Sequence, residues 1–597
     1  MTLIAGIVSR GNHPLPVSAC DSLRQLISRH PSDEVMVFKD ERSYLLKMDA
    51  SVYGEPAVKL DENGALTLLA GEPLLSLGNA DAWQSRELDV ALIHDDCVRG
   101  GRSGALKRAQ GVFCAVHYEA ATGTLKLIAD KLCLRPLYYW VDERYVIFAS
   151  ALRILEGVVE IPKKMDVRAV TEIIGLGYPL AQRTPYADIC LLKAAEVVLI
   201  TEKKIARSHY WRWDEITPSS EPEEKLLEKL SAGFESAVAR RNRSDTTTIA
   251  YLSGGLDSRC VVAALRSQNV RVHTFNFARP HTQDQIFGLD FARQVEAIHE
   301  EVPKEAGDHV PDYSSLMAEV WNASKHRAAY PAERPALVWS GEGGSVDLGH
   351  VHMSEKIVEL MRAGQLDAAI EEYSEREYVY ISPKLFRPEV FATLAGVIHR
   401  GIREELESLH AEDPARSFYL FLMLNDQRRK LARHFENIDL HRLEFQLPFF
   451  DSAFLAAIVA APVDLCLRHK LYVKWLAYFH PAVTRVPWQA YPGHEPCPLP
   501  IPQGLTYQWA DEYQAAERAT QKQRLTKQAT ALLRAADFPE RILNKRNLRL
   551  ATWVHATGWR NYEHIIEAAH TFHTYWQKSN GEYALPSSDL NTSELAR

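Results

Sequence analysis

The pattern of hydrophobic and polar positions separates a strand-rich first part of the chain from a longer, mainly helical second part. Short alternating or continuous apolar runs predict strands throughout the first 210 residues or so. These runs are residues 3–8, 65–69, 111–118, 124–129, 145–149 and 196–200. A polar, proline-containing segment at 217–222 precedes a helical pattern that begins at Glu223, so we expect a linker there.

In the second part, strand-like runs alternate with long helical patterns, and each run ends in a loop. The three runs are residues 246–252, 271–277 and 336–339. This alternation predicts a parallel sheet whose ligand lies at the carboxyl ends of the strands. We therefore expect an α/β and α+β protein with a first domain at 1–212, a second at 223–580 and a polar tail at 581–597.

The first of these runs leads into the stretch YLSGGLDS at 251–258, which is followed by apolar residues at helical spacing. Gly254 and Gly255 let the backbone approach a ligand, and the N–H groups of the first helical turn have no partner within the helix. Asp257 would repel a phosphate unless a cation lay between them, so we expect a magnesium-bound polyphosphate. The alternative is an ordinary tight turn. The predicted binding residues are Leu252, Ser253, Gly254, Gly255, Asp257 and Ser258.

The string SGGLDS is similar to the pyrophosphate-binding loop of ATP pyrophosphatases, which cleave ATP between the α and β phosphates. No Lys-Ser or Lys-Thr pair follows the glycines, which excludes a Walker loop. The resemblance implies ATP and Mg²⁺ as cofactors and a substrate that is activated as an adenylate.

The other two strand ends carry further candidate residues. An apolar strand end beside a nucleotide loop usually forms the adenine slot, and a predicted helix with Asp284, Ala292 and His299 follows the second run. The third run ends in SGEGGS at 340–345, where a carboxylate at Glu342 could hold magnesium or take a proton from an incoming amine. A glycine turn with one exposed glutamate is the alternative. The predicted nucleotide-binding residues at these ends are Phe277, Ser340 and Gly341.

Composition narrows the function classes. With 597 residues, 46% hydrophobic and 24% charged, the chain is expected to be globular with two or three domains. No apolar run reaches the roughly 20 residues that span a bilayer, and the beginning lacks the features of a signal peptide, so we expect a cytoplasmic protein without a membrane partner. The net charge of −8 argues against a general nucleic-acid binder.

The cysteines, the basic clusters and one histidine-containing run are interpreted as structural or surface features and not as functional sites. The eight cysteines are scattered without a C-x-x-C pair, so we expect reduced, mostly buried thiols. The basic clusters at 240–243 and 545–549 are interpreted as solvated helix faces. The spacing of Glu567, His570 and His573 invites a metal interpretation, but one such run is more often surface or packing.

Taken in order, the motifs resemble the asparagine synthetase family over nearly the whole chain. SGGLDS, the strand at 272–277, SGEG at 340–343 and LPFFD at 447–451 occur in the family's order and approximate spacing. The N-terminal part resembles the family's glutaminase domain, which implies an N-terminal-nucleophile (Ntn) αββα sandwich. The stretches that carry this second resemblance are Ile4-x-Gly6-Ile7, 110–113, Asp130, 135–139, 148–150 and 210–211.

Departures from the family pattern in the first domain concern the glutaminase chemistry. The family's nucleophile is a cysteine directly after the initiator methionine, and this chain has Thr2. A hydroxyl is a far weaker nucleophile than a thiolate for this amide chemistry. The asparagine–glutamate motif that cradles glutamine is reduced to AGE at 70–72. The two losses predict an inactive domain kept for structure, which produces no ammonia.

The synthetase part departs from the family at two places. Where the family has an acidic pair after SGEG, this chain has GSV at 344–346 and then Asp347, which we assign with Asp257 to magnesium. The family's lysine-bearing loop is altered to RVPWQAYPGH at 485–494. A cation is needed there to neutralise the pyrophosphate leaving group or a developing oxyanion. The candidate cations are Arg485, Lys470 and Lys474.

An asparagine synthetase fold without the glutaminase cysteine needs another amine. The family's solutions include β-lactam synthetases and lasso peptide macrolactam synthetases (lasso cyclases), and the stretches 343–350 and 488–494 look most like the lasso cyclases. This resemblance implies an AMP-forming ligase that adenylates an Asp or Glu side chain of a precursor peptide. The peptide's own N-terminal amine would then close a macrolactam (isopeptide) ring, with Glu342 taking its proton.

Three alternatives remain open at this point: an ammonia-dependent asparagine synthetase, a β-lactam-type synthetase and a nucleotide-binding scaffold without enzymatic activity. The lasso interpretation implies a precursor peptide, a leader peptidase and a small leader-binding protein as partners. It also predicts a large cleft at the carboxyl ends of the three strands, partly covered by the loop at 486–500.

Overall fold

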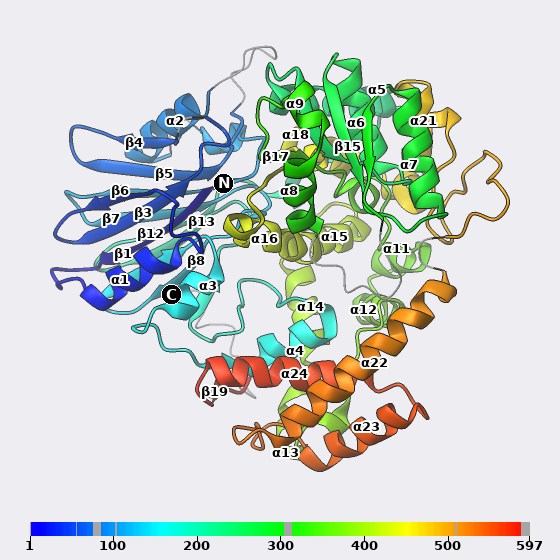
Figure 1. Ribbon diagram of the computed structural model, residues 1–597. Helices are drawn as coiled ribbons and strands as arrows, with labels where there is room; N and C mark the ends of the chain where they lie inside the picture. The colour runs from blue at the N-terminus through cyan, green and yellow to red at the C-terminus, as the bar shows by residue number, and fades with distance from the viewer. Residues whose placement is uncertain are drawn as a thin grey trace.

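The computed structural model describes residues 2–54, 56–75, 85–101, 104–303, 313–507 and 510–586 (Figure 1). The N-terminal part contains two antiparallel six-stranded sheets that face each other. The first consists, in spatial order, of β11 (Ile189–Leu191), β8 (Tyr138–Val141), β9 (Tyr145–Ala149), β1 (Thr2–Ser9), β3 (Ser43–Asp49) and β2 (Val35–Lys39). The second consists of β13 (Ile205–His209), β12 (Glu196–Ile200), β7 (Thr124–Ala129), β6 (Phe113–Glu119), β5 (Ala65–Gly71) and β4 (Val58–Leu60).

Helices cover the outer faces of both sheets. The helices α1 (Val17–Leu26) and α3 (Leu152–Gly157) pack on the first sheet, and α2 (Arg86–Val98) packs on the second. All eight residues of β1 are buried, because this strand contacts α1 on one side and β5 of the opposite sheet on the other. The result is the predicted αββα sandwich, with the six expected strands at or within two residues of their predicted positions.

The second part is built on a parallel five-stranded sheet. Its spatial order is β16 (Ile298–Glu301), β15 (Arg271–Asn276), β14 (Thr247–Tyr251), β17 (Leu337–Trp339) and β18 (Glu444–Gln446). The three predicted strands are confirmed, while β16 and β18 were not predicted. From β14 the chain proceeds to β15 and β16 on one side, and it later adds β17 and β18 on the other. The switch point between β14 and β17 is the place where parallel sheets bind ligands.

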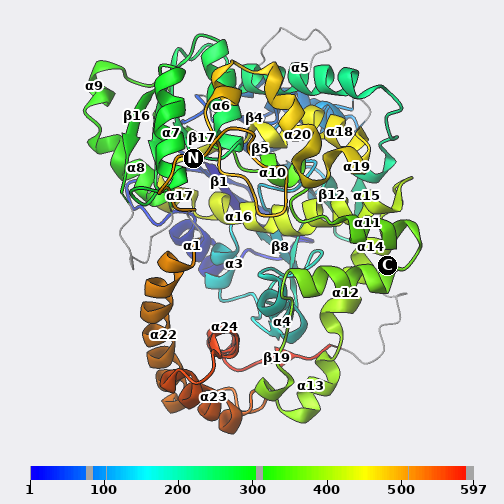
Figure 2. The ribbon, with the colours of Figure 1, turned by 90° about the vertical axis from the view of Figure 1, so that its right-hand side faces the viewer.

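Helices enclose this sheet on both faces (Figures 1 and 2). Those around it are α5 (Glu223–Asn242), α6 (Asp257–Ser267), α7 (Gln283–Gln294), α8 (Tyr313–Ala323), α9 (His326–Ala329), α10 (Gly344–Asp347), α18 (Ser452–Ala460), α19 (Val463–Cys466), α20 (Lys470–Trp475) and α21 (Ala482–Arg485). A second group lies below it: α4 (Val167–Leu176), α11 (Glu355–Arg362), α12 (Leu366–Arg376), α13 (Pro388–Leu394), α14 (Val397–Glu407), α15 (Pro414–Phe421), α16 (Arg428–Glu436) and α17 (Ile438–His441). A π-helical segment, Leu422–Gln427, joins α15 to α16.

The last three helices lie at the lower end of both views, where α24 packs against α4 (Figures 1 and 2). They are α22 (Asp511–Arg534), α23 (Lys545–Thr557) and α24 (Glu563–Lys578). The chain then returns to the first domain, where β19 (Tyr583–Ala584) pairs in parallel with β10 (Met165–Asp166). Two residues of the predicted tail at 581–597, Tyr583 and Ala584, belong to this strand, and residues 587–597 lie outside the described part.

Two further expectations can be compared with the fold. All eight cysteines are free, and five of them are buried. Within the described ranges, no single helix is long and apolar enough to cross a membrane. One pair of helical segments, Ser452–Ala460 and Val463–Tyr478, passes by length and composition only when the two are combined across a bend of 108°.

Candidate active site

The SGGLDS loop leaves the carboxyl end of β14 and opens α6 at Asp257. Side chains brace its backbone: Ser253 N donates to Ser258 Oγ at 2.9 Å, and Gly255 N donates to Ser253 Oγ at 3.3 Å. Gly254 N donates to Asp284 Oδ1 at 2.7 Å, and a Cβ at Gly254 would lie 2.6 Å from the Cα atom of Asp284. Glycine is therefore required at 254 so that the first turn of α7 can close on the loop.

The loop after β17 meets the SGGLDS loop directly, as the sequence predicted. A Cβ on Gly341 would lie 2.3 Å from Ser258 N, and one on Gly344 would lie 2.6 Å from Asp257 Cγ. Ser345 donates to the Asp257 carboxylate from both its N (3.0 Å) and its Oγ (2.9 Å). The two glycines thus bring two strand ends into contact at the switch point.

Asp257 and Asp347 form a buried pair of carboxylates beside these glycines. Tyr472 OH also donates to Asp257 Oδ1, at 2.7 Å, and burial raises the pKa of Asp257. Burial and the charge of Asp257 raise the pKa of Asp347 well above its usual range. Both oxygens of Asp347 are buried and have no hydrogen-bond partner among the described residues.

A divalent cation fits this arrangement. A hard cation stabilises the ionised form of buried carboxylates such as these, and it would offset the burial that raises both pKa values. No group of three or more His, Cys, Asp or Glu side chains with metal-binding geometry occurs in the described ranges. Asp257 and Asp347 would therefore hold Mg²⁺ together with ligands from a substrate phosphate, as is usual for nucleotide sites.

A cavity of about 140 Å³ adjoins the loop. It is lined by Ser253, Gly255, Leu256, Asp257, Asp284, Ser345, His469, Trp488, Gln489, Ala490, Tyr491, His494, Glu495 and Tyr507. The segment 488–495 forms its lid, and Gln489 N donates to Gly254 O at 3.0 Å. The predicted covering loop is thus in place. The predicted large cleft is not found here, because the lid lies directly on the SGGLDS loop.

Arg259, one residue beyond the loop, anchors the chain that leads into the lid. Its guanidinium is fully buried and donates to the carbonyl oxygens of Val483 (3.0 Å), Val486 (2.7 Å) and Pro487 (2.8 Å). Burial without a carboxylate partner lowers the pKa of Arg259 to about 10. One side chain of α6 therefore fixes the approach of the lid to the loop that α6 opens.

Two histidines in this cavity were missed by the sequence reasoning. The Nδ1 atoms of His469 and His494 lie 2.8 Å apart, and the ring of His469 stacks between those of Tyr472 and Tyr491, with centroids 5.6 and 5.5 Å away. Burial, and the neighbouring imidazole, lower the pKa of His469 to about 3; burial lowers that of His494 to about 4. The two imidazoles are therefore neutral in the empty cavity. They become positively charged only when a bound anion offsets the effect of burial.

The His469–His494 pair depends on a turn with a strained backbone. Arg468 and His469 both have positive φ, 57° and 63°, which is rare for residues other than glycine. The turn is held by contacts with the lid, because Arg468 Nε donates to Gly493 O at 2.9 Å and Glu495 N donates to Arg468 O at 3.0 Å. These contacts place His494 against His469, a proximity that a separation of 25 residues in the sequence does not reveal.

The three predicted cations lie elsewhere. The ammonium of Lys474 pairs with Glu223 at 2.7 Å on the surface, and that of Lys470 lies 3.6 Å from Glu355. Arg485 ends α21 with an exposed side chain. No lysine or arginine occurs among the residues that line the cavity, so within the described chain His469 and His494 are the basic side chains in it.

Glu342 takes a position separate from the cavity lining. Its side chain is 43% exposed, and Oε1 lies 3.2 Å from His434 Nε2 on α16. The ring of His434 in turn packs on Phe445 of β18. An accessible carboxylate that contacts an imidazole can accept a proton from an amine and pass it on, which is the role expected for Glu342.

The region expected to bind adenine is formed at the ends of β14 and β15. The rings of Phe277 and Tyr251 lie 6.1 Å apart, and Leu252 O accepts from Asn276 Nδ2 at 2.9 Å. The prediction that His299 lies on a helix with Asp284 is wrong, because α7 ends at Gln294 and His299 is on β16. The strand β16 is short and polar, with the sequence IHEE, and it lacks the alternation of apolar and polar residues by which a strand is predicted.

At the start of β1, the side chain of Thr2 is enclosed by charged groups. Its Oγ1 lies 3.4 Å from Glu444 Oε1 of β18, and Arg86 Nη2 donates to the same hydroxyl at 3.2 Å. The carboxylate of Asp49 pairs with Arg86 at 2.9 Å and with the ammonium of Lys47 at 3.2 Å. Burial and the charge of Arg86 lower the pKa of Lys47 to about 7.

Glu444 links this cluster across the domain boundary. Its carboxylate is completely buried, pairs with Arg135, and accepts from Tyr53 OH at 3.1 Å. Glu72, the last residue of the reduced AGE motif, accepts from Gln446 Nε2 of the same strand at 2.9 Å. Side chains of β18 therefore fill the place where the resemblance would put a glutamine substrate.

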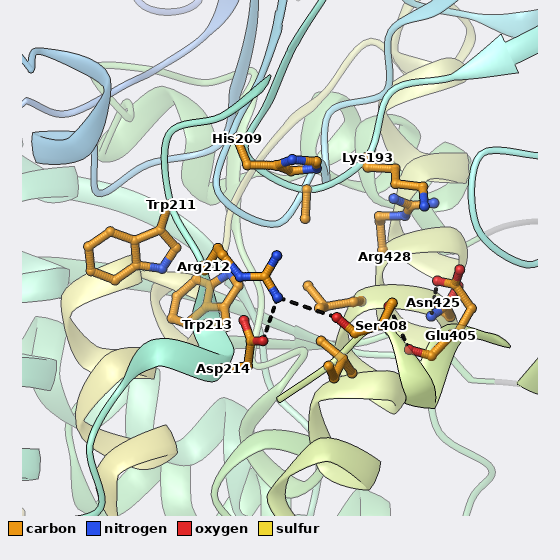
Figure 3. A pocket seen from close by; sticks show the side chains of 13 residues that line it. Lys193, His209, Trp211, Arg212, Trp213, Asp214, Glu405, Ser408, Asn425 and Arg428 are labelled. Carbon is orange, nitrogen blue, oxygen red and sulfur yellow. Dashed lines mark hydrogen bonds and ion pairs between the residues drawn. The ribbon is translucent and has the colours of Figure 1, made fainter. Parts of the chain in front are cut away.

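A further cavity of about 160 Å³ lies at the junction of the two domains (Figure 3). Arg212 Nη2 donates to Asp214 Oδ2 at 2.6 Å and to Ser408 O at 3.3 Å, and His410 N donates to Asp214 at 2.9 Å. Figure 3 shows the aromatic rings of Trp211 and Trp213 beside this contact. The arrangement fastens the chain where it leaves the first domain.

Two family models match the chain. A glutamine amidotransferase domain matches residues 82–211, and asparagine synthase matches residues 229–477. Residues 229–477 are thus similar to asparagine synthases, and residues 82–211 are similar to glutamine amidotransferase domains. The synthetase match contains the sheet, both carboxylates and His469, whereas the lid and α22–α24 lie beyond its end.

The individual proteins to which the chain is similar are distant from it. The chain is 29% identical over 177 residues to a putative glutamine-hydrolysing asparagine synthetase 2 of Methanocaldococcus jannaschii, which covers 29% of this chain and 34% of the relative. It is 24% identical over 157 residues to asparagine synthetase 3 of Bacillus subtilis (26% and 25%), and 24% over 242 residues to a putative asparagine synthetase of Mycobacterium tuberculosis (39% and 36%). The matches thus span a quarter to about a third of these asparagine synthetases.

Solved structures give weaker similarity. A glutamine phosphoribosylpyrophosphate amidotransferase from Bacillus subtilis is 13% identical, with a TM-score of 0.24, over 50% of this chain and 80% of that one. A second structure, an allosteric regulatory enzyme of purine biosynthesis, gives 12% identity and a TM-score of 0.25 over 52% and 82%.

Proposed function

We propose that this protein is an ATP-dependent, AMP-forming amide ligase that closes a macrolactam in a precursor peptide. The observation that carries the proposal is the contrast between its two family sites. Thr2 stands where the family has its cysteine nucleophile, and its hydroxyl is in contact with Arg86 and Glu444. The SGGLDS loop and the loop of Glu342 nevertheless remain assembled at the ends of their strands. Such a ligase must obtain its amine from a source other than glutamine.

In the first step, the carboxylate of the substrate attacks the α-phosphorus of ATP and the bond to the β-phosphate breaks. The loop amides and the N-terminus of α6 bind the phosphates, and Asp257 and Asp347 would hold Mg²⁺. A bound magnesium ion would neutralise charge on the phosphate oxygens. The His469–His494 pair faces the departing pyrophosphate and supplies one shared proton, in the place of the family's lysine.

In the second step, the amine attacks the carbonyl carbon of the acyl adenylate and AMP leaves with the bonding electrons. The amine must lose a proton, and Glu342 takes it, with His434 as the next acceptor. An intramolecular amine gains a high effective concentration only when the substrate is held in a folded shape. The first domain contributes to this reaction as a rigid support and not as a source of ammonia.

One further cavity is large enough to hold a folded peptide. It has a volume of about 1050 Å³ and is lined by residues of α4, α16, α22 and α24 and by Tyr378 and Tyr380. Glu342 is not among its lining residues; the nearest link is α16, where Arg433 lines the cavity and His434 contacts Glu342. Precursor, leader peptidase and leader-binding protein are part of this proposal, as is a cytoplasmic location.

The proposal is tested with the purified chain, ATP, Mg²⁺ and the peptides encoded by short reading frames beside its gene. Mass spectrometry should find a product lighter by one water, with an Asp or Glu side chain joined to the peptide's own N-terminus. Formation of asparagine from free aspartate and ammonia, with the peptides left linear, would replace the proposal by ammonia-dependent asparagine synthesis. Ammonia-dependent asparagine synthesis is the second candidate, and it is favoured by the similarity to proteins named asparagine synthetases. Ring closure of a small amino acid would instead favour a β-lactam-type synthetase.

The role of the histidine pair has its own readout. Pyrophosphate binding should raise the pKa values of His469 and His494 and therefore take up protons near pH 6, which calorimetry in buffers of different ionisation enthalpy measures. The uptake should disappear in His469→Gln/His494→Gln. Binding without proton uptake removes the pair from the mechanism. If neither nucleotide exchange nor product is found, the closed lid and small cavity favour a nucleotide-binding scaffold.

A further inference from the structure

The helix α23 carries exposed as well as buried apolar side chains. Leu548, Ala551 and Val554 are buried, and the helix packs against α22 and α24. On the outer face, Leu550 and Trp553 are each 60% exposed. A helix of a globular protein normally carries apolar residues on one face, so the outer face of α23 requires a separate explanation.

A cavity of about 400 Å³ lies on this outer face, within the ~300–1,000 Å³ that ligand pockets usually have. Its lining residues are Lys384, Asn547, Leu550, Ala551, Trp553, Val554, Trp559, Arg560, Tyr562 and Ile565. Trp559 is 78% exposed, and together with Trp553 it is one of the two tryptophans that are exposed within the described ranges. Tryptophan, tyrosine and arginine are the residues most concentrated at protein-binding hot spots.

The charges at this cavity have one sign. Lys384 and Arg560 line it, and none of its lining residues is an aspartate or a glutamate. Arg546 and Arg549 are exposed on the adjoining turns of α23, so the basic cluster at 545–549 borders the apolar face. This surface is complementary to a ligand that combines apolar side chains with carboxylates.

We propose that this surface, formed by Lys384, Leu550, Trp553, Trp559 and Arg560, is a docking site for a short acidic peptide segment of another protein. Apolar side chains of the segment would enter the cavity between the two tryptophans. Its carboxylates would pair with Lys384 and Arg560 at the rim. The proposal is independent of the reaction catalysed, since α23 lies at the opposite end of the molecule from the sheet loops (Figure 1).

The geometry argues for a peptide over the two other occupants of such a surface. A membrane favours a protruding apolar face, whereas these tryptophans border a hollow of about 400 Å³. A symmetric dimer through this face would bring two positively charged surfaces together, with repulsion between like charges. A concave surface with one sign of charge is best matched by a segment of the opposite charge.

The experiment pans a random 12-residue peptide library against the intact protein. We expect enriched peptides that contain Asp or Glu together with Leu, Phe or Trp. Fluorescence titration should show that Trp559→Ala/Arg560→Glu binds them at least about tenfold more weakly, as expected for a hot spot. The matched control is Lys59→Glu/Leu60→Ala on β4, where Leu60 is 57% exposed, and it should bind like the wild type.

The substituted side chains are exposed and far from the candidate active site, so melting temperature and nucleotide exchange should be unchanged. The proposal is wrong if no enriched peptide distinguishes the variant from the wild type, or if the enriched peptides lack acidic residues. Flotation of the wild type but not the variant with phosphatidylglycerol vesicles would assign the surface to a membrane instead. A dimer in light scattering that the variant abolishes would assign it to a second copy of this chain.

Discussion

The carboxylate of Glu444 and the hydroxyl of Thr2 lie in contact across the boundary between the two domains, with 3.4 Å between Oε1 and Oγ1. Arg135 and Tyr53 hold the same carboxylate, and Glu444 is completely buried. Glu444 thus joins the second domain to three residues of the first, Thr2, Tyr53 and Arg135.

Replacing Glu444 by Gln should lower the free energy of unfolding by about 3–5 kcal/mol, because the buried guanidinium of Arg135 would lose its charged partner. Urea unfolding measures this change. The matched control is Arg144→Ala, which removes an exposed pair with Asp142 at 3.9 Å and should change stability by less than about 0.5 kcal/mol. Equal effects of the two substitutions would show that the buried cluster is not structural.

Thr2→Cys should not create glutaminase activity. A thiol at this position would be buried between Arg86 and Glu444, with no space for an amide substrate. Ammonia release from glutamine is the measurement, and Thr2→Ala should leave product formation unchanged. Glutamine hydrolysis by the wild type that Thr2→Ala abolishes would contradict an inactive first domain.

Asp257→Asn should reduce ATP–pyrophosphate exchange by at least about a hundredfold while the protein stays folded, because the substitution keeps the shape and removes the charge that would face magnesium. Tyr472→Phe is the control, since it removes one hydrogen bond to the same carboxylate and leaves its charge in place. A milder loss is expected for Tyr472→Phe. Undiminished exchange in Asp257→Asn would refute the assignment of the nucleotide loop.

Glu342→Gln should separate the two half-reactions. Its side chain lies outside the cavity of the SGGLDS loop and contacts His434, so pyrophosphate exchange should persist while amide formation falls by about a hundredfold. Quench-flow analysis of AMP and of the amide product would measure both steps. Loss of exchange as well as of product would assign Glu342 to metal or phosphate binding instead of proton transfer.

The His469–His494 pair should make the protein sensitive to acid. The unfolded chain protonates histidine near pH 6.5, whereas the pKa values in the folded state are about 3 and about 4. Between these values the unfolded state binds more protons, so the contribution to stability is complete above pH 6.5 and is lost as the pH falls toward 3–4. Urea unfolding at a series of pH values should give a shallower slope for His469→Gln/His494→Gln. An unchanged slope would mean that the two imidazoles titrate normally in the folded protein.

The sequence predicted those parts of the site that depend on local geometry. The SGGLDS and SGEG loops require glycine because Gly254 and Gly341 allow backbone contacts that a Cβ would prevent, and this demand is visible in the sequence. β14 was predicted because residues 246–252 are rich in β-branched side chains and end in apolar ones, as is typical of a buried strand. Local chemistry and hydrophobic period therefore located the ligand-binding edge of the sheet.

The rest depends on partners that are distant in the sequence. β18 is the tripeptide Glu-Phe-Gln, and its glutamate is tolerated in the core only because Arg135 of the other domain meets it. His469 and His494 are brought together by the strained turn at Arg468. No periodicity marks either arrangement, since both are produced by tertiary contacts.

The pairing of β10 with β19 has a consequence for biosynthesis. Met165–Asp166 belongs to the domain that leaves the ribosome first, yet its parallel partner Tyr583–Ala584 is translated long afterwards. A nascent or truncated chain that stops before residue 583 leaves that short strand without its parallel neighbour. The first domain therefore gains this strand pair only after residues 583–584 have been synthesised, so this part of it completes its folding late.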